Sequence, residues 1–167
     1  GGNLALDFAN TVDWRLTEDP QELIPDYATL LRWSELRGTL PAAAIKRLRT
    51  LCGKEPAGAE AVLKEARKFR AEIGRDATAL AKGESVDLAP INRRLAAAPA
   101  QPRLVKSAGS HVYDLPGRRL EEPLWPVLWS WAAVLTSEDA RRLGWCQGQG
   151  CGWYFVDESP NHSRAWC

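Results

Sequence analysis

The first ten residues alternate in polarity, with large apolar side chains at Leu4, Leu6 and Phe8. A period of two is typical of a strand with one buried face, because successive side chains point to opposite faces of a sheet. The pattern therefore predicts a strand that ends near Asn10 and Thr11.

Apolar residues spaced by three and four positions dominate the next hundred residues and predict helices. The longest is predicted over residues 57–83, where an apolar stripe opposes a strongly charged face. Shorter helices are predicted over residues 26–37, 41–53 and 88–98. Gly38 suits the end of the first of these, because glycine readily takes the left-handed conformation that follows a helix.

Later residues predict a hairpin and a further helix. Two extended runs in residues 103–115 flank Ala108-Gly109-Ser110, which is typical of a β-hairpin. Residues 121–135 predict a helix whose two prolines lie in its first turn. Residues 136–139 resemble a helix cap and predict a short turn that ends at Gly144.

Composition adds bounds to this picture. The 167 residues are 45% hydrophobic and 26% charged, with a net charge of +1, which is typical of one globular domain with a small appendage. The chain contains no apolar run of about 18 residues and no signal-peptide pattern at its start, so we expect no membrane span and a cytoplasmic location. Because methionine is absent even at position 1, we expect the sequence to be part of a longer chain.

Three of the four cysteines lie near the end of the sequence, at Cys146, Cys151 and Cys167. In a reducing compartment, clustered cysteines favour a metal site over disulfides. Glycines at 148, 150 and 152 provide the unusual backbone angles that a tight metal-binding loop needs. The alternative is a set of small core thiols, as we expect for the isolated Cys52.

Two segments resemble known families. Cys146-x4-Cys151-Gly152 and the residues that follow resemble the zinc finger of the CGNR family; these are Phe155, Asp157, Ser159, Asn161, Arg164, Trp166 and Cys167. GGNLALDFANTV at residues 1–12 resembles the opening of the ABATE domain, which precedes this finger in the same family. DYATLLRWSELRG and RLVKSAGSHVYDL also fall where that domain places a helix and a hairpin.

The resemblance implies a bacterial transcription regulator, with a sensor-like ABATE domain over residues 1–140 and a finger over residues 141–167. It implies an α+β fold: a mostly helical domain with a small antiparallel sheet made from the N-terminal strand and the hairpin, followed by a zinc-finger-like module. It also implies one structural Zn²⁺ and DNA as partner. The family's fourth cysteine and a basic tail are expected beyond Cys167, with His162 as a disfavoured substitute ligand.

Arg141, Arg142 and Arg164 are the candidate DNA contacts of the finger. Against Asp157 and Glu158 they leave a local charge of only +1 over residues 141–167. An ion pair of Arg164 with Asp157 is the alternative to a DNA contact. The finger's three tryptophans favour packing over base stacking, because so small a module has almost no other core; they are Trp145, Trp153 and Trp166.

Asp7, Asn10 and Thr11 form a polar group that is a candidate lining for a small-molecule effector pocket, although Asp7 also suits a capping or solvent-facing role. No convergent catalytic group appears, so we expect no enzyme, and an open zinc site with hydrolytic activity is disfavoured. A homodimer is compatible with the sequence. The alternative function is a domain for small-ligand or protein interaction, with structural zinc and no DNA role.

Overall fold

The computed structural model describes residues 2–99, 102–107, 109–161 and 163–167. Its helices are α1 (Leu4–Ala9), α2 (Tyr27–Leu36), α3 (Ala42–Lys54), α4 (Pro56–Ala81), α5 (Ala89–Ala97) and α6 (Trp125–Leu135), with short 3₁₀ turns at η1 (Glu122–Leu124) and η2 (Glu138–Arg142). Its strands form three separate antiparallel pairs: β1 (Val12–Asp13) with β2 (Gln21–Glu22), β3 (Leu104–Ser107) with β4 (Ser110–Tyr113), and β5 (Leu143–Trp145) with β6 (Tyr154–Val156). The α+β class is confirmed.

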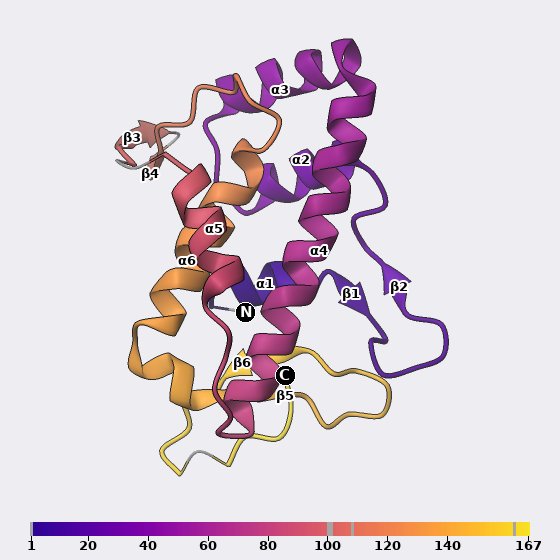
Figure 1. Ribbon diagram of the computed structural model, residues 1–167, viewed down its shortest axis with the longest axis vertical. Helices are drawn as coiled ribbons and strands as arrows, with labels where there is room; N and C mark the ends of the chain where they lie inside the picture. Colours follow the sequence, from indigo (N-terminus) through magenta and orange to yellow (C-terminus); the bar gives the residue numbers. More distant parts are fainter. Residues whose placement is uncertain (1, 100–101, 108, 162) are drawn as a thin grey trace.

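Helix α4 runs along the long axis of the molecule and links its two ends (Figure 1). Helices α2 and α3 lie at one end, and the β5–β6 pair lies at the other. Helices α1 and α6 pack beside the middle of α4, where Phe8 of α1 meets Trp33 and Phe69 at ring-centroid distances of 5.3 and 6.4 Å. The core is therefore built around α1, a short helix enclosed by longer ones.

The predicted N-terminal strand is wrong, because residues 4–9 form α1. The side chain of Asn3 caps this helix by accepting the N–H groups of Ala5 and Leu6 at 3.0 and 3.2 Å. The buried residues of α1 are Ala5, Leu6, Phe8 and Ala9, which form one helical face. The apparent period of two arose because Ala5 and Ala9 were assigned to the polar face, although both are buried.

The other predicted elements are confirmed within a few residues. Helices α2, α3, α4 and α5 match the four predicted stretches, and α6 follows a 3₁₀ turn that contains Pro123. The hairpin pairs Leu104 with Tyr113, while Ala108 of its predicted turn lies outside the described residues. Since the N-terminal strand does not exist, the hairpin forms a sheet by itself. No helix in the described part of the chain has the length and apolar character to span a membrane.

Candidate metal centre

A tight loop between β5 and β6 positions the first two cysteines. Strand β5 leads directly into Cys146, whose backbone N–H donates to Trp153 O at 2.7 Å, and the N–H of Cys151 donates to Gly148 O at 3.0 Å. Gly150 has a φ of +77°, which glycine adopts without strain. The glycines predicted to shape the loop therefore close it into a knuckle with both thiols on one side.

The segment after β6 brings the third cysteine to this knuckle. Asp157 caps the turn: its Oδ1 accepts the N–H of Ser159 at 2.8 Å, and its Oδ2 accepts the backbone N–H of Arg164 at 2.9 Å. Gln147 N–H donates to Ala165 O at 2.9 Å, which returns the chain beside the loop. These bonds place Cys167 next to the other two thiols.

The three sulfur atoms have the spacing of a metal site. The Sγ atoms of Cys146, Cys151 and Cys167 all lie within 4.8 Å of one another, and those of Cys151 and Cys167 are 3.8 Å apart. A tetrahedral zinc with Zn–S bonds of about 2.3 Å separates its sulfur ligands by roughly 3.8 Å. None of these cysteines forms a disulfide. The donor set therefore fits Zn²⁺, with a fourth position left for another ligand; His162 lies outside the described residues.

The environment of the thiols differs from one to the next. The backbone N–H of Cys167, aided by that of Gly148, lowers the pKa of Cys146, whereas burial raises the pKa of Cys151 to about 11. Cys146 is buried and Cys167 is exposed, so the cluster faces solvent on one side. A bound Zn²⁺ would displace the thiol protons and offset the repulsion between neighbouring thiolates.

The finger is bound tightly to the rest of the chain through Asn10. This side chain accepts the backbone N–H of Tyr154 at 2.8 Å and donates to the carbonyl of the same residue at 2.9 Å. The Tyr154 hydroxyl lies 3.1 Å from Thr78 Oγ1 on α4, beside Gly74, where the lack of a side chain leaves room for the ring. Residue 10 therefore pairs with β6 much as a neighbouring strand would.

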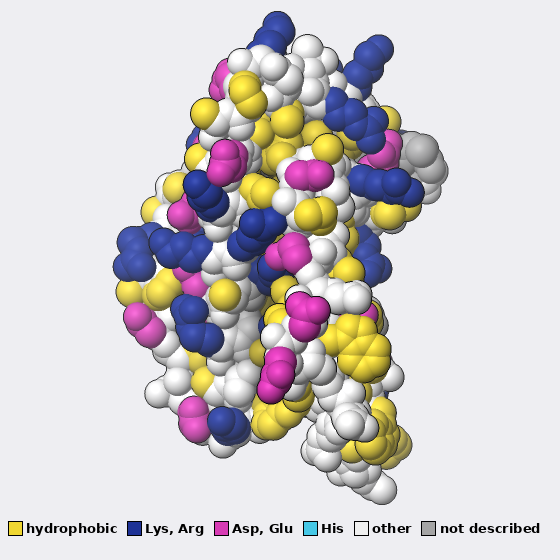
Figure 2. Space-filling model, turned by 90° about the vertical axis from the view of Figure 1, so that its right-hand side faces the viewer, with side chains coloured by type: hydrophobic (Ala, Val, Ile, Leu, Met, Phe, Trp, Pro, Cys, Tyr) yellow, Lys and Arg dark blue, Asp and Glu magenta, His cyan; other side chains and the backbone are white. Residues whose placement is uncertain are grey.

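The loop after β1 supports the knuckle from the other side. Leu16 N–H donates to Gly150 O at 3.1 Å. A Cβ at Gly150 would lie 2.7 Å from Thr17 Cγ2, and one at Gly152 would lie 2.8 Å from Leu16 Cγ. Trp14, which has a φ of +50°, and Leu16 remain 49% and 60% exposed in this arrangement. Apolar side chains gather at the lower end of the face in Figure 2, the end that carries the finger.

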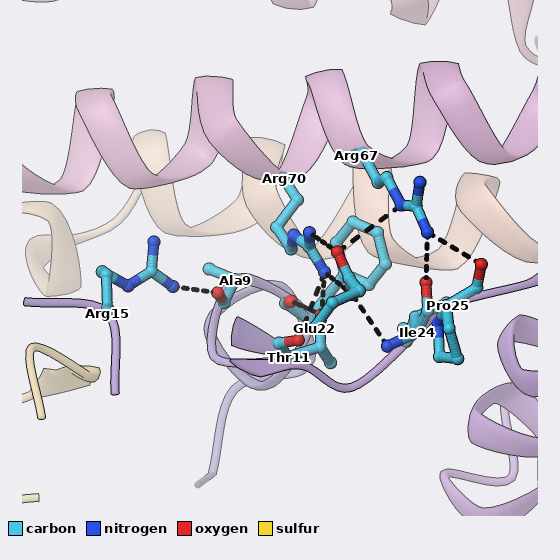
Figure 3. A network of polar contacts seen from close by, with 9 residues as sticks. Ala9, Thr11, Arg15, Glu22, Ile24, Pro25, Arg67 and Arg70 are labelled. Carbon is cyan, nitrogen blue, oxygen red and sulfur yellow. Dashed lines mark hydrogen bonds and ion pairs between the residues drawn. The ribbon is translucent and has the colours of Figure 1, made fainter. Parts of the chain in front are cut away.

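A network of arginines holds this loop on α4 (Figure 3). Arg70 donates to Glu22 Oε1 at 2.7 Å and to Thr11 Oγ1 at 3.0 Å, and Arg15 donates to Ala9 O while its guanidinium lies 4.8 Å from the Tyr154 ring centre. Burial opposes ionisation of Glu22, but hydrogen bonds from Arg70 and from the Ile24 N–H hold its pKa below the ordinary value. The network fixes the β1–β2 pair, and so it fixes the loop that contacts the knuckle.

The predicted DNA-contact arginines occupy three different environments. Arg141 is largely exposed and pairs with Glu138 at 3.2 Å, and Arg142 is exposed at the end of η2. The guanidinium of Arg164 lies over the Phe155 ring at 4.8 Å and donates to Trp166 O at 2.7 Å, while its backbone N–H donates to Asp157 Oδ2 at 2.9 Å. Their role with DNA stays a prediction.

The predicted effector residues have contacts of their own. Asp7 forms an ion pair with Arg37 at 3.2 Å, Asn10 bonds to Tyr154, and Thr11 bonds to Phe8 O and Arg70. The three side chains thus turn to separate partners, and their role in ligand binding stays a prediction.

Sequence reasoning did not anticipate that Asn10 and residues 14–17 hold the finger. Their contacts join positions more than 130 residues apart, and the local pattern carries no sign of them. Of the finger's tryptophans, Trp145 packs against the main core and Trp153 is partly buried, as expected, whereas Trp166 is 62% exposed.

Comparison with known families agrees with this geometry. Residues 2–138 match the model of the ABATE family, described as "Putative stress-induced transcription regulator", and residues 142–167 match that of the CGNR zinc finger. Both descriptions concern regulatory or zinc-finger proteins, not enzymes. A search of curated proteins finds no match. With three clustered thiols inside the matched finger, the chain belongs to the ABATE family and carries a CGNR zinc finger with a structural zinc site.

Proposed function

We infer that this chain is a DNA-binding transcription regulator whose finger contacts DNA while the zinc serves a structural role. The single observation that carries the proposal is the zinc-type cluster of Cys146, Cys151 and Cys167 within a CGNR finger attached to an ABATE domain. A thiolate-rich site is typical of structural zinc, because its ligands hold two chain segments together.

The role of the metal follows from the path of the chain. Cys167 ends the segment that carries Arg164 and Trp166, and the knuckle thiols lie on the loop fixed by Asn10 and Leu16. Zinc joins that segment to the knuckle. In the proposed function the metal therefore sets the position of Arg164 relative to the ABATE domain.

Arg164 is the strongest candidate for a phosphate contact in the finger. It is exposed, and its stacking over Phe155 and its bond to Trp166 O restrict the side chain before DNA arrives. Less conformational entropy is then lost on binding. Arg141 and Arg142, at the end of η2, are the second and third candidates.

The test is DNA binding by the zinc-loaded chain, using fragments selected from a random-sequence pool. Anisotropy titrations between about 50 and about 200 mM salt give the slope of log K against log salt concentration. This slope is negative, and its magnitude decreases by roughly 0.9 for each lost phosphate contact. Arg164→Ala is expected to reduce that slope by about one phosphate contact. Arg93→Ala is the matched control, because Arg93 is exposed on α5, and this substitution is expected to leave the salt slope unchanged.

The charge of the finger favours a second candidate, an interaction domain with structural zinc and no DNA role. Over residues 141–167, three arginines oppose two carboxylates, which leaves a net charge of only +1. Such a surface attracts phosphates weakly. Zinc-loaded protein that selects no fragment and shows no salt-dependent binding would favour this candidate over the regulator.

A further inference from the structure

A cavity of about 470 Å³ lies between the end of α5, the β3–β4 hairpin, the loop after it and α6. In Figure 1 the hairpin lies beside one end of α5, near α6. Its volume is in the range of sites that bind small molecules. The cavity shares no wall with the cysteine cluster or with Asp7, Asn10 and Thr11.

Aromatic and aliphatic side chains form one wall of the cavity. Tyr113 of the hairpin and Trp129 of α6 have ring centroids 4.4 Å apart, inclined at 57°. Trp125, one turn earlier on α6, is only 8% exposed, and Leu115 is buried beside it. Aromatic surface of this kind favours a flat apolar ligand, because rings gain from stacked or edge contacts in addition to area burial.

Three arginines line the cavity: Arg103, Arg118 and Arg119. The Arg119 guanidinium lies over the Trp125 ring at 5.1 Å, with Glu121 at 3.7 Å. Among the described residues, no ion pair or side-chain hydrogen bond engages the guanidinium groups of Arg103 and Arg118. Two exposed arginines beside an aromatic wall are thus available to an anion.

A buried carboxylate fixes the loop that carries two of these arginines. Glu122 is 1% exposed, and its oxygens accept the backbone N–H groups of Gly117, Arg118 and Arg119 at 2.6, 2.6 and 2.9 Å. Gly117 has a φ of +71°, and a Cβ there would lie 2.6 Å from Ala44 O on α3. These contacts fix the backbone of the loop, so Arg118 and Arg119 start from a defined position at the cavity before a ligand binds.

The charge of the cavity favours an anion over a cation. Glu122 is occupied by three N–H groups and withdrawn from solvent, which leaves Asp114 as the exposed carboxylate of the lining against three arginines. Arginine recognises carboxylates through paired N–H donors in one plane.

We propose that this cavity is a binding site for a planar aromatic carboxylate. The ring system lies against Trp125, Trp129 and Tyr113, and the carboxylate accepts hydrogen bonds from Arg103 and Arg118. The site is independent of the DNA role of the finger.

The probe is naphthalene-2-carboxylate, titrated calorimetrically into the zinc-loaded chain, with the neutral naphthalene-2-carboxamide as the matched ligand. The expected result is one carboxylate bound per chain with a Kd below about 1 mM, and at least tenfold weaker binding of the amide. Arg118→Ala and Arg103→Ala each weaken carboxylate binding by about tenfold. Arg32→Ala, at an exposed arginine of α2 outside the cavity lining, leaves it unchanged.

Because Arg103 and Arg118 are exposed, neither substitution threatens the fold, and circular dichroism verifies this. The proposal is overturned if the carboxylate fails to bind at about 1 mM. Equal binding of the amide, or equal effects of Arg118→Ala and Arg32→Ala, overturns it too, since the arginines would then not recognise the anion.

Discussion

The bond between Asn10 and the finger leads to a quantitative prediction for Asn10→Ala. This substitution removes two hydrogen bonds, to the N–H and the carbonyl of Tyr154, at 2.8 and 2.9 Å. Tyr154 is only 8% exposed, so both backbone groups lose their partner in a place with little access to water. Each unsatisfied group costs about 1–3 kcal/mol, so the two together give a loss of roughly 2–6 kcal/mol in the free energy of unfolding.

Urea unfolding of the zinc-loaded protein, followed by tryptophan fluorescence, measures this loss. Asn92→Ala is the matched control, because Asn92 is exposed on α5 and its removal should change stability by less than about 0.5 kcal/mol. A chelator is also expected to remove zinc faster from Asn10→Ala, since the finger is no longer fixed to α1. If the two variants have equal stability and equal zinc retention, residue 10 does not hold the finger.

Three further predictions concern the same end of the molecule. Glu22→Gln leaves the buried Arg70 without its carboxylate and is expected to cost about 2 kcal/mol at neutral pH. Because the folded state lowers the pKa of Glu22, the stability that its carboxylate contributes is complete above about pH 4.5 and is lost as the pH falls through the lower folded pKa. The urea midpoint of Glu22→Gln should therefore vary less with pH over this window than that of the parent protein. Gly150→Ala, at a φ of +77°, should lower the free energy of unfolding by roughly 1–3 kcal/mol and weaken zinc binding in a chelator competition. Gly53→Ala, at a position with open space around it, should cause neither loss. Zinc removal should speed hydrogen exchange in residues 146–167 and leave α4 protected; uniform exchange throughout the chain would contradict a local structural role.

The sequence predicted the long helices well, because their apolar stripes repeat over several turns. In α4 the stripe extends through 26 residues, and the charged face opposite it leaves no other assignment. Helix α1 has only six residues, too few for the period to be decided, and its burial comes from Ala5 and Ala9 as much as from Phe8. Tertiary packing on α4 and α6 therefore decided its conformation.

The candidate metal site was also readable, since both the knuckle cysteines and their glycines are close in sequence. The contacts that hold the finger could not be read from the sequence, because Asn10 and Tyr154 are 144 positions apart. The aromatic cavity was missed for the same reason: Arg103, Arg118 and Trp129 come from three segments, and only the fold brings them together.

The central claim is that Cys146, Cys151 and Cys167 together hold one structural zinc ion. Native mass spectrometry of the purified chain, with Cys146→Ser and Cys52→Ser as test and control, measures it most directly. The account predicts one zinc per chain in the parent protein and in Cys52→Ser, and none in Cys146→Ser. A parent protein without zinc, or Cys146→Ser with zinc fully retained, would contradict it.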